Sequence, residues 1–248
     1  MGRPGVLPND PGAIIAIRSH LPPANAILGA LPPAIFKRLQ ADIETVELKL
    51  GHVLYEPGDG ARHVYFPIDS LLSLLVVTDD DALEVGMVGR EGMVGLPLAA
   101  GYPISPVRVL VQGGGSAMRL PGARFMREVA ASEKLRRRVD RSLYVGMVTA
   151  MQIAACNKFH LLGERLARWL LMVRDRVGRD EFPLTQDFLA KMLGVRRAGV
   201  NEAASELQRR KLIVYRRGRV AIVDRDGVRA AACSCYEVIR KLENAAAR

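Results

Sequence analysis

Basic side chains crowd into one short segment of the sequence. Between Thr185 and Arg219 there are nine basic residues and three acidic ones, a local net charge of +6. Arginine and lysine at this density bind the phosphates of nucleic acid, and such contacts hold a protein on DNA without reading its sequence. The chemistry predicted for this segment is therefore recognition of a polyanion.

The same segment contains the elements needed to present these charges. Thr185 is a good helix N-cap, because its side-chain oxygen can accept a hydrogen bond from an unpaired amide, and an apolar helical pattern follows as far as Gly194. A second helix is predicted from near Arg196, with Val200 and Leu207 on its apolar face. Two helices joined by a tight glycine-containing turn are typical of a helix-turn-helix.

The outer face of the second helix is polar and small. At about 100° per residue, the side chains opposite the apolar stripe are Ala198, Glu202, Ser205 and Arg209, with Arg197 at the amino end and Asn201 on the flank. Such a face fits a recognition helix that enters the major groove of DNA. The alternative is a solvated helical pair that serves packing or protein contact.

A cationic hairpin is predicted directly after the recognition helix. In "LIVYRRGRVAIV" two β-rich runs enclose Arg216, Arg217, Gly218 and Arg219, which is the pattern of the wing in a winged helix. We expect the phosphate backbone to be held by residues of the helix-turn-helix and of the wing, namely Thr185, Arg196, Ser205, Arg209, Arg216, Arg217 and Arg219.

Length and charge limit the class of protein. The chain has 248 residues, a net charge of +10 and 49% hydrophobic residues, which favours two modest domains and a polyanionic partner. Ile14 to Ile17 is too short for a signal peptide, and no apolar run approaches the about 18 residues that span a bilayer. Val6 stands where a myristoylation pattern needs Ser or Thr. A cytoplasmic protein without a membrane partner is expected.

The N-terminal half is predicted to be a β-barrel domain over residues 23–131. Residues 1–22 are expected to be a disordered or linker segment, and Ala24 to Leu39 a short helix or helical pair. Seven short strands are predicted between Glu44 and Leu120, in "TVELKL", "HVLYEP", "VYFPI", "LLSLLVV", "ALEVGMV", "VRVLVQ" and "SAMRL". Seven strands at this spacing suggest a sandwich or jelly-roll barrel.

A long helix is predicted over residues 132–158, where glycine and proline nearly vanish. Its apolar residues recur at alternating spacings of four and three, which is a heptad seam for a second copy of the helix; the members are Val139, Leu143, Gly146, Ala150, Ile153 and Asn157. Gly146 and Ala150 would let two such helices approach closely. The alternative is an amphipathic helix packed on its own barrel.

The remaining segment, 159–248, holds the DNA-binding elements and two further helices. His160 to Val177 is predicted as a helix with Trp169 in its core stripe, and Asp226 to Leu242 as an added helix beyond the wing. The three cysteines show no paired metal-ligand spacing, so we expect no metal site and no cofactor. Cys233 and Cys235 are either a redox pair or buried thiols on the apolar side of the last helix.

The order of these parts resembles the bacterial cyclic-AMP receptor and fumarate-nitrate regulator (Crp/Fnr) family over nearly the whole chain. The specific part is "LTQDFLAKMLGVRRAGVNEAASELQRRKLI". The resemblance implies an α+β chain with an N-terminal cyclic-nucleotide-binding-like jelly roll, a long dimerisation helix and a C-terminal winged helix. It also implies a homodimeric transcription regulator on a palindromic operator in double-stranded DNA, with RNA polymerase as a further candidate partner.

The resemblance places the base-reading residues at Arg197, Ala198 and Glu202, with Asn201 beside them. Only Arg197 keeps the type usual in the family, so the operator is expected to differ from the best-known consensus. Our hypothesis is that Arg197 donates to guanine O6 and N7 and that Glu202 accepts from a cytosine amino group.

The barrel departs from the pattern of relatives that bind a cyclic nucleotide. Leu96 follows Gly95 where the ribose-binding glutamate should stand, and Ser105 and Pro106 occupy the place of the phosphate-binding arginine pair. Arg108 could replace that arginine only with a longer loop. We therefore expect no tight binding of cyclic AMP, and a pocket that holds another effector or none. The N-terminal cysteines of the fumarate-nitrate branch are also missing, which argues against an iron–sulfur site.

Two other functional classes fit the sequence less well than a regulator. An enzyme is disfavoured because the four histidines are scattered and show no pattern with a nucleophile. A signal-binding or scaffold protein would use the winged helix for protein contact or for non-specific nucleic-acid contact. Such a protein would bind DNA without sequence preference. A regulator would instead bind its operator much more tightly than random DNA.

Overall fold

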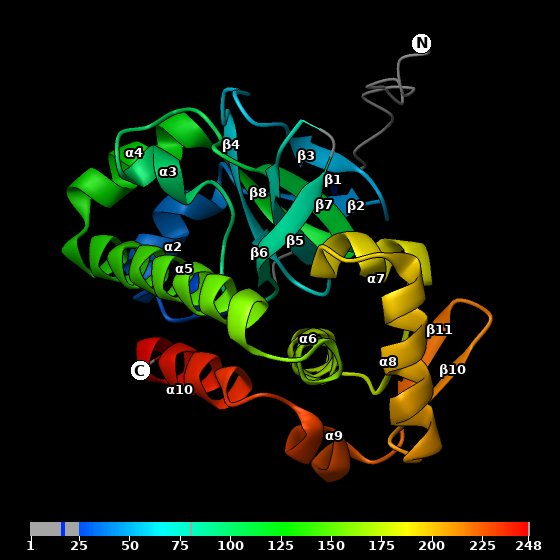
Figure 1. Ribbon diagram of the computed structural model, residues 1–248. Coiled ribbons are helices and arrows are strands. Elements are labelled where there is room, and N and C mark those ends of the chain that lie inside the picture. Colours follow the sequence, from blue (N-terminus) through cyan, green and yellow to red (C-terminus); the bar gives the residue numbers. More distant parts are fainter. Residues whose placement is uncertain (1–15, 18–24, 80, 248) are drawn as a thin grey trace.

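The computed structural model describes residues 16–17, 25–79 and 81–247, and the predicted linker over residues 1–22 lies almost wholly outside them. A β-sheet domain sits against one long helix, and a helical domain with a small sheet packs on the far end of that helix (Figure 1). The predicted α+β class and the order of its parts are confirmed. Within the described chain, no helix is both long and apolar enough to cross a membrane.

Two antiparallel four-stranded sheets form the barrel. All seven predicted strand segments form strands, and a two-residue strand before them, β1 (Ala16–Ile17), was not predicted. One sheet has the order β1-β2-β8-β4 and the other the order β3-β7-β5-β6. The bounds are β2 Glu44–Leu48, β3 Val53–Tyr55, β4 His63–Pro67, β5 Leu71–Val77, β6 Ala82–Val88, β7 Arg108–Gly113 and β8 Gly115–Pro121.

The helices α1 (Ala26–Gly29) and α2 (Pro33–Gln40) close one end of the barrel. The fully buried Asn25 caps α1, and its amide donates to the carbonyls of Pro67 (3.0 Å) and Gly92 (2.8 Å). Each of its buried polar atoms therefore has a partner, as burial requires. Pro32 and Pro33 divide the predicted helical stretch into a pair.

The long helix α5 (Glu133–Phe159) has 27 residues and follows α3 (Leu96–Ala99) and α4 (Gly122–Ala131). The Ser132 side chain caps it by accepting from the Leu135 amide (3.3 Å). Val139 is buried in the barrel core and Ile153 in the core of the helical domain. Neither can belong to a seam with a second copy, so the predicted heptad register is wrong at these positions.

An exposed apolar stripe lies on another face of α5. Tyr144, Met147 and Met151 are 57%, 50% and 61% exposed. Each follows a predicted seam residue by one position, which rotates the stripe by about 100° around the helix. The predicted seam therefore faces the protein's own cores or cavity over much of its length, and the apolar face left over is the neighbouring one.

The C-terminal domain contains the helices α6 (Leu162–Val177), α7 (Gln186–Leu193) and α8 (Arg197–Arg209), followed by two more helices. Its sheet has the order β10-β11-β9, with bounds β9 Glu181–Pro183, β10 Ile213–Arg216 and β11 Arg219–Ile222. The single added helix predicted after the wing is two helices, α9 (Arg225–Ala231) and α10 (Cys235–Ala247), because the backbone is extended at Ala232. Helix α10 turns back along α5 (Figure 1).

Buried polar contacts join the two domains. Trp169 lies in the core, as predicted, and its indole nitrogen donates to Oε1 of the buried Glu84 (2.8 Å), which comes from β6. Arg176 of α6 is also buried, and it forms ion pairs with Glu91 of the barrel domain (2.9 Å) and with Glu243 of α10. The relative position of the domains therefore depends on these charges.

Burial raises the pKa of Glu84 to about 7, against the hydrogen bond from Trp169 and the charges of Arg168 and Arg176. Because the folded pKa lies above the unfolded one, the folded protein holds the proton more tightly. This contribution to stability is complete below the unfolded pKa and is lost as the pH rises through about 7.

We predict that Glu84→Gln removes this pH dependence, because the amide still accepts from Trp169 and cannot ionise. Between about pH 5.5 and pH 8.5 the wild type should lose about 2 kcal/mol more of its unfolding free energy than the variant. Urea unfolding followed by Trp169 fluorescence measures the unfolding free energy of wild type and variant at each pH, since Trp169 is the only tryptophan. Parallel pH profiles for the two proteins would contradict the prediction.

Candidate nucleic-acid interface and buried cavity

The helix-turn-helix is built by α7, a glycine turn and α8. Thr185 caps α7 by accepting from the Phe188 amide (3.2 Å), as predicted. Gly194 ends the helix with φ +62°, a left-handed conformation that costs glycine least. Leu189, Val200 and Leu207 are buried together with α6, which fixes α8 across α7.

The polar face of α8 is open to solvent. All four residues predicted to read bases are exposed, and so are the seven predicted to hold the phosphate backbone. The first four are Arg197, Ala198, Asn201 and Glu202. This arrangement leaves the amino-terminal end of α8 free to approach a groove.

Polar contacts across the turn orient the first of these side chains. Gln186 donates to Oδ1 of Asn201 (3.1 Å), and Arg197 donates from Nε to Oε1 of Gln186 (3.5 Å). Asp187 lies 3.5 Å from Nη1 of Arg197. Sequence reasoning missed Gln186, although its place in the first turn of α7 is the available signal.

The wing is a tight two-residue hairpin. Arg217 and Gly218 both have positive φ, 49° and 72°, and Arg216 pairs with Arg219 across the turn. This is the turn that matches the twist of two antiparallel strands. The Leu184 amide donates to the Gly218 carbonyl (2.7 Å), which ties the wing to the start of the helix-turn-helix.

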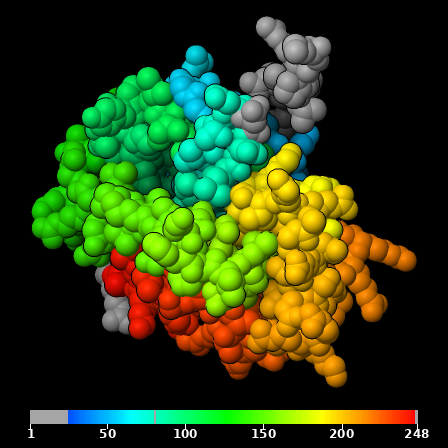
Figure 2. Space-filling view, in the orientation of Figure 1, coloured from blue at the N-terminus to red at the C-terminus, as the bar shows by residue number. Residues whose placement is uncertain are grey.

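The basic residues of this surface differ in their partners. Arg219 pairs with Glu181 of β9 (2.5 Å) and Arg209 pairs with Glu206, so both charges are partly compensated. Arg196, Arg216 and Arg217 form no ion pair with any described residue. Figure 2 shows the wing projecting from the body of the molecule, and Arg216, Arg217 and Arg219 are exposed.

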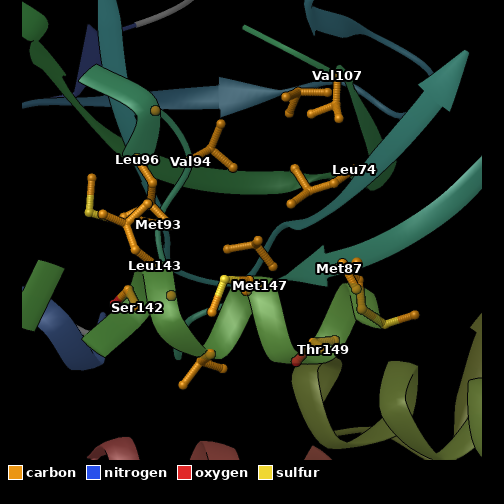
Figure 3. Close-up of a pocket in the computed structure, with 18 of the residues that line it drawn as sticks. Leu74, Met87, Met93, Val94, Leu96, Val107, Ser142, Leu143, Met147 and Thr149 are labelled. Atoms are coloured by element: carbon orange, nitrogen blue, oxygen red, sulfur yellow. The ribbon is translucent and has the colours of Figure 1, made fainter. Parts of the chain in front are cut away.

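A cavity of about 440 Å³ lies between the barrel and α5. Figure 3 shows apolar side chains from both sides of it, with Leu74, Val94 and Val107 from the barrel and Leu143 and Met147 from α5. A cavity of this size is large enough for a small molecule.

The cavity contains most of the residues predicted for a degenerate effector pocket. Gly95, Leu96, Ser105 and Pro106 line it, but Arg108 does not belong to its lining. Arg108 instead donates to Glu56 (2.8 Å). It is therefore not a substitute for a phosphate-binding arginine inside the cavity.

Some polar groups of the cavity are already paired, whereas the buried Thr149 hydroxyl has no hydrogen-bond partner among the described residues. The Ser105 hydroxyl donates to the Val107 carbonyl (2.7 Å). Arg138 and Arg176 are the arginines among the described lining residues, and Arg176 is neutralised by Glu91 and Glu243. The wall is thus suited to apolar contact more than to a charged phosphate.

The family comparison decides the class of the C-terminal domain. Residues 164–231 match the family model described as the Crp-like helix-turn-helix domain. The chain carries a Crp-like helix-turn-helix domain. The match covers α6 through α9, including the capped helix α7, the recognition helix and the wing, so the sequence resemblance to Crp/Fnr regulators is confirmed.

The solved structures extend the likeness to the whole architecture. A Crp/Fnr family transcriptional regulator from Eubacterium rectale matches with TM-score 0.67 at 15% identity, over 84% of this chain and 98% of that one. FixK2 from Bradyrhizobium japonicum matches with TM-score 0.68 at 13% identity, over 77% and 98%. A CRP/FNR family regulator from Thermus thermophilus matches with TM-score 0.60 at 23% identity, over 76% and 98%. No curated protein matches the sequence significantly.

The sequence analysis did not bring together one side-chain cluster, whose members lie just before and just after the Crp-like domain. Cys156 and His160 at the end of α5 meet Cys233 and Cys235 at the start of α10. The three cysteines show no paired metal-ligand spacing in the sequence, but His160 lies four residues after Cys156. The spacing of Cys156 to His160, together with Cys233-Ser234-Cys235, is the signal that was available.

Proposed function

We propose that this protein is a homodimeric transcription regulator that binds a palindromic operator in DNA. The observation that carries the proposal is the Crp-like helix-turn-helix, whose recognition helix exposes a polar face next to a cationic wing. Crp/Fnr regulators bind DNA, and transcription regulation is the function that this domain supports.

Sequence is read by the amino-terminal part of α8. Arg197 donates to the O6 and N7 acceptors of a guanine, and Glu202 accepts from a cytosine amino group, with Ala198 and Asn201 between them on the same face. In the free protein Gln186 and Asp187 hold Arg197, so its side chain is oriented before DNA arrives. The phosphate backbone is held by Arg196 and the wing arginines.

The dimer forms through the exposed stripe of α5. Tyr144, Met147 and Met151 are large apolar side chains in contiguous helical turns, and exposed apolar surface of this kind marks an association site. A two-fold axis along this face would bring two copies of the helix together and set two recognition helices on successive half-sites.

The cavity between the barrel and α5 takes an uncharged apolar effector in this proposal, and it does not bind cyclic AMP. The cyclic phosphate would need a fixed cation and donors in the cavity, because a buried charge is costly without them. Leu96, Ser105 and Pro106 supply no such cation, and Arg176 is already paired.

The sequence specificity of DNA binding is tested first by sequencing genomic fragments that the full-length protein retains at physiological salt. Enrichment of a two-fold symmetric motif is the expected result. Retention without a motif would favour the alternative, a scaffold whose winged helix makes non-specific or protein contacts.

With the operator known, Arg197→Ala should lower operator affinity by about 10- to 100-fold and leave affinity for random DNA unchanged. The matched control is Arg217→Ala in the wing, which should weaken both DNAs alike and reduce the salt dependence of binding by about one phosphate contact. Fluorescence anisotropy at several salt concentrations measures both. An equal loss on both DNAs for Arg197→Ala would exclude base reading by this residue.

Met151→Glu should break the dimer, because a carboxylate buried in an apolar seam costs several kcal/mol unless it is paired. We expect the dissociation constant of the dimer to rise about 100-fold or more, measured by sedimentation equilibrium. Val76→Glu is the matched control, since Val76 is an exposed apolar residue of the barrel. A dimer that survives Met151→Glu would place the seam on another face.

Calorimetry should detect no binding of cyclic AMP, because Ser105 and Pro106 stand where the family's phosphate-binding arginine pair would be. N-phenyl-1-naphthylamine, an uncharged fluorescent probe, should bind instead. Leu143→Trp, whose larger side chain fills part of the cavity, should lower the affinity for the probe. Micromolar affinity for cyclic AMP would contradict this account of the cavity. Equal affinity of the probe for the wild type and for Leu143→Trp would show that the probe binds outside the cavity.

A further inference from the structure

Four side chains with metal-binding atoms meet at the junction of α5, α6 and α10. The sulfurs of Cys156, Cys233 and Cys235 and a ring nitrogen of His160 all lie within 4.8 Å of one another. The sulfurs of Cys156 and Cys233 are 3.4 Å apart, and Nδ1 of His160 lies 3.4 Å from the Cys235 sulfur. The three cysteines are buried and free.

The backbone brings these residues together from two distant segments. Cys156 lies in the last turn of α5, and the His160 amide donates to the Cys156 carbonyl (3.1 Å), which keeps both side chains at the helix end. Cys233 and Cys235 flank the start of α10, where the Cys233 amide approaches the Glu164 carbonyl (3.4 Å). Backbone hydrogen bonds to α5 and α6 therefore hold His160 and Cys233, which lie in the connections next to these helices.

The spacing of the four atoms fits one tetrahedral metal ion. Ligands at about 2.3 Å from a zinc ion lie about 3.8 Å from one another at the corners of a tetrahedron. A set of three cysteines and one histidine is a structural zinc ligand set. An iron–sulfur cluster would hold the cysteine sulfurs further apart, because several iron and sulfide ions would lie between them.

The charges around the cluster suit an anionic centre. Three thiolates and a neutral histidine give a zinc site one net negative charge. Arg165 and Arg168 of α6 are buried, and the Nε atom of each has no hydrogen-bond partner. The positive charges of these two guanidinium groups would offset the negative charge of a zinc–thiolate centre.

A further hydrogen bond orients one ligand from outside. Gln152 of α5 donates from Nε2 to the Cys235 sulfur (3.1 Å). Donors of this kind fix the direction of a ligating thiolate and are a regular feature of metal sites.

We propose that Cys156, His160, Cys233 and Cys235 bind one zinc ion. The ion clamps the amino end of α10 to the end of α5, at the point where the chain leaves the dimer helix for the DNA-binding domain. This inference does not depend on the proposed function, because metal binding is measured without DNA.

The test uses the full-length chain, purified under reducing conditions without chelator. Elemental analysis should find about one zinc ion per chain. Reconstitution with Co²⁺ should produce the intense visible bands of a tetrahedral cobalt–thiolate site. Cys235→Ser and His160→Gln should abolish stoichiometric retention of metal, and Gln152→Ala should lower zinc affinity by about 10- to 100-fold in a chelator competition.

Two variants serve as controls. Ser234→Ala changes the residue between the two cysteines, and His52→Gln changes a histidine of the barrel; both should keep the metal. Chelation should lower the Tm of the wild type and leave that of Cys235→Ser unchanged. Wild-type protein that folds without zinc and gives no cobalt–thiolate bands would overturn the proposal. A Cys156–Cys233 disulfide found by mass spectrometry in metal-free folded protein would overturn it in favour of a redox pair.

Discussion

The helix α5 packs against the barrel core, the core of the C-terminal domain and the wall of the cavity at once, and the rest of the molecule is arranged around that constraint. Leu135 and Val139 complete the barrel core at one end of α5, and Ile153 enters the core of the DNA-binding domain at the other. Between them Leu143 borders the cavity. Because an α-helix has only about 3.6 residues per turn, these contacts occupy one side, and the neighbouring face is left to Tyr144, Met147 and Met151, of which Met147 also borders the cavity.

The strand β6 connects the cavity with the winged helix. Gly86 and Met87 line the cavity, while Glu84 accepts from Trp169 of α6. Leu83 packs so closely against Gly194 that a Cβ there would lie 2.7 Å from its Cδ1 atom. A ligand in the cavity that shifted β6 would therefore disturb the contacts of this strand with α6 and with the end of α7.

Local patterns predicted the elements of this chain well, because each has its own signal in the sequence. The Thr185 cap, the Gly194 turn and the wing around Arg217 and Gly218 depend on neighbours a few residues away, and all three form as expected. Leu96, Ser105 and Pro106 do line the cavity. Arg108 does not, since its partner Glu56 lies on a distant strand connection that the sequence does not place. The exposure of Arg197 and Glu202 followed from the helix period alone.

The wrong register of the α5 seam and the missed cysteine cluster share one physical cause. The pattern of a helical face does not identify the element that packs against it. The heptad pattern of α5 is real, but Val139 and Ile153 satisfy it by packing within the protomer, and the period is the same whether the neighbour is a barrel or a second copy. Cys156 and Cys233 are 77 residues apart in sequence and 3.4 Å apart in space, because α10 reverses direction and returns to α5. That reversal depends on the extended backbone at Ala232, between two segments that each favour a helix. A metal site assembled by tertiary packing therefore leaves only its residue types in the sequence, and their meeting is decided by one bend.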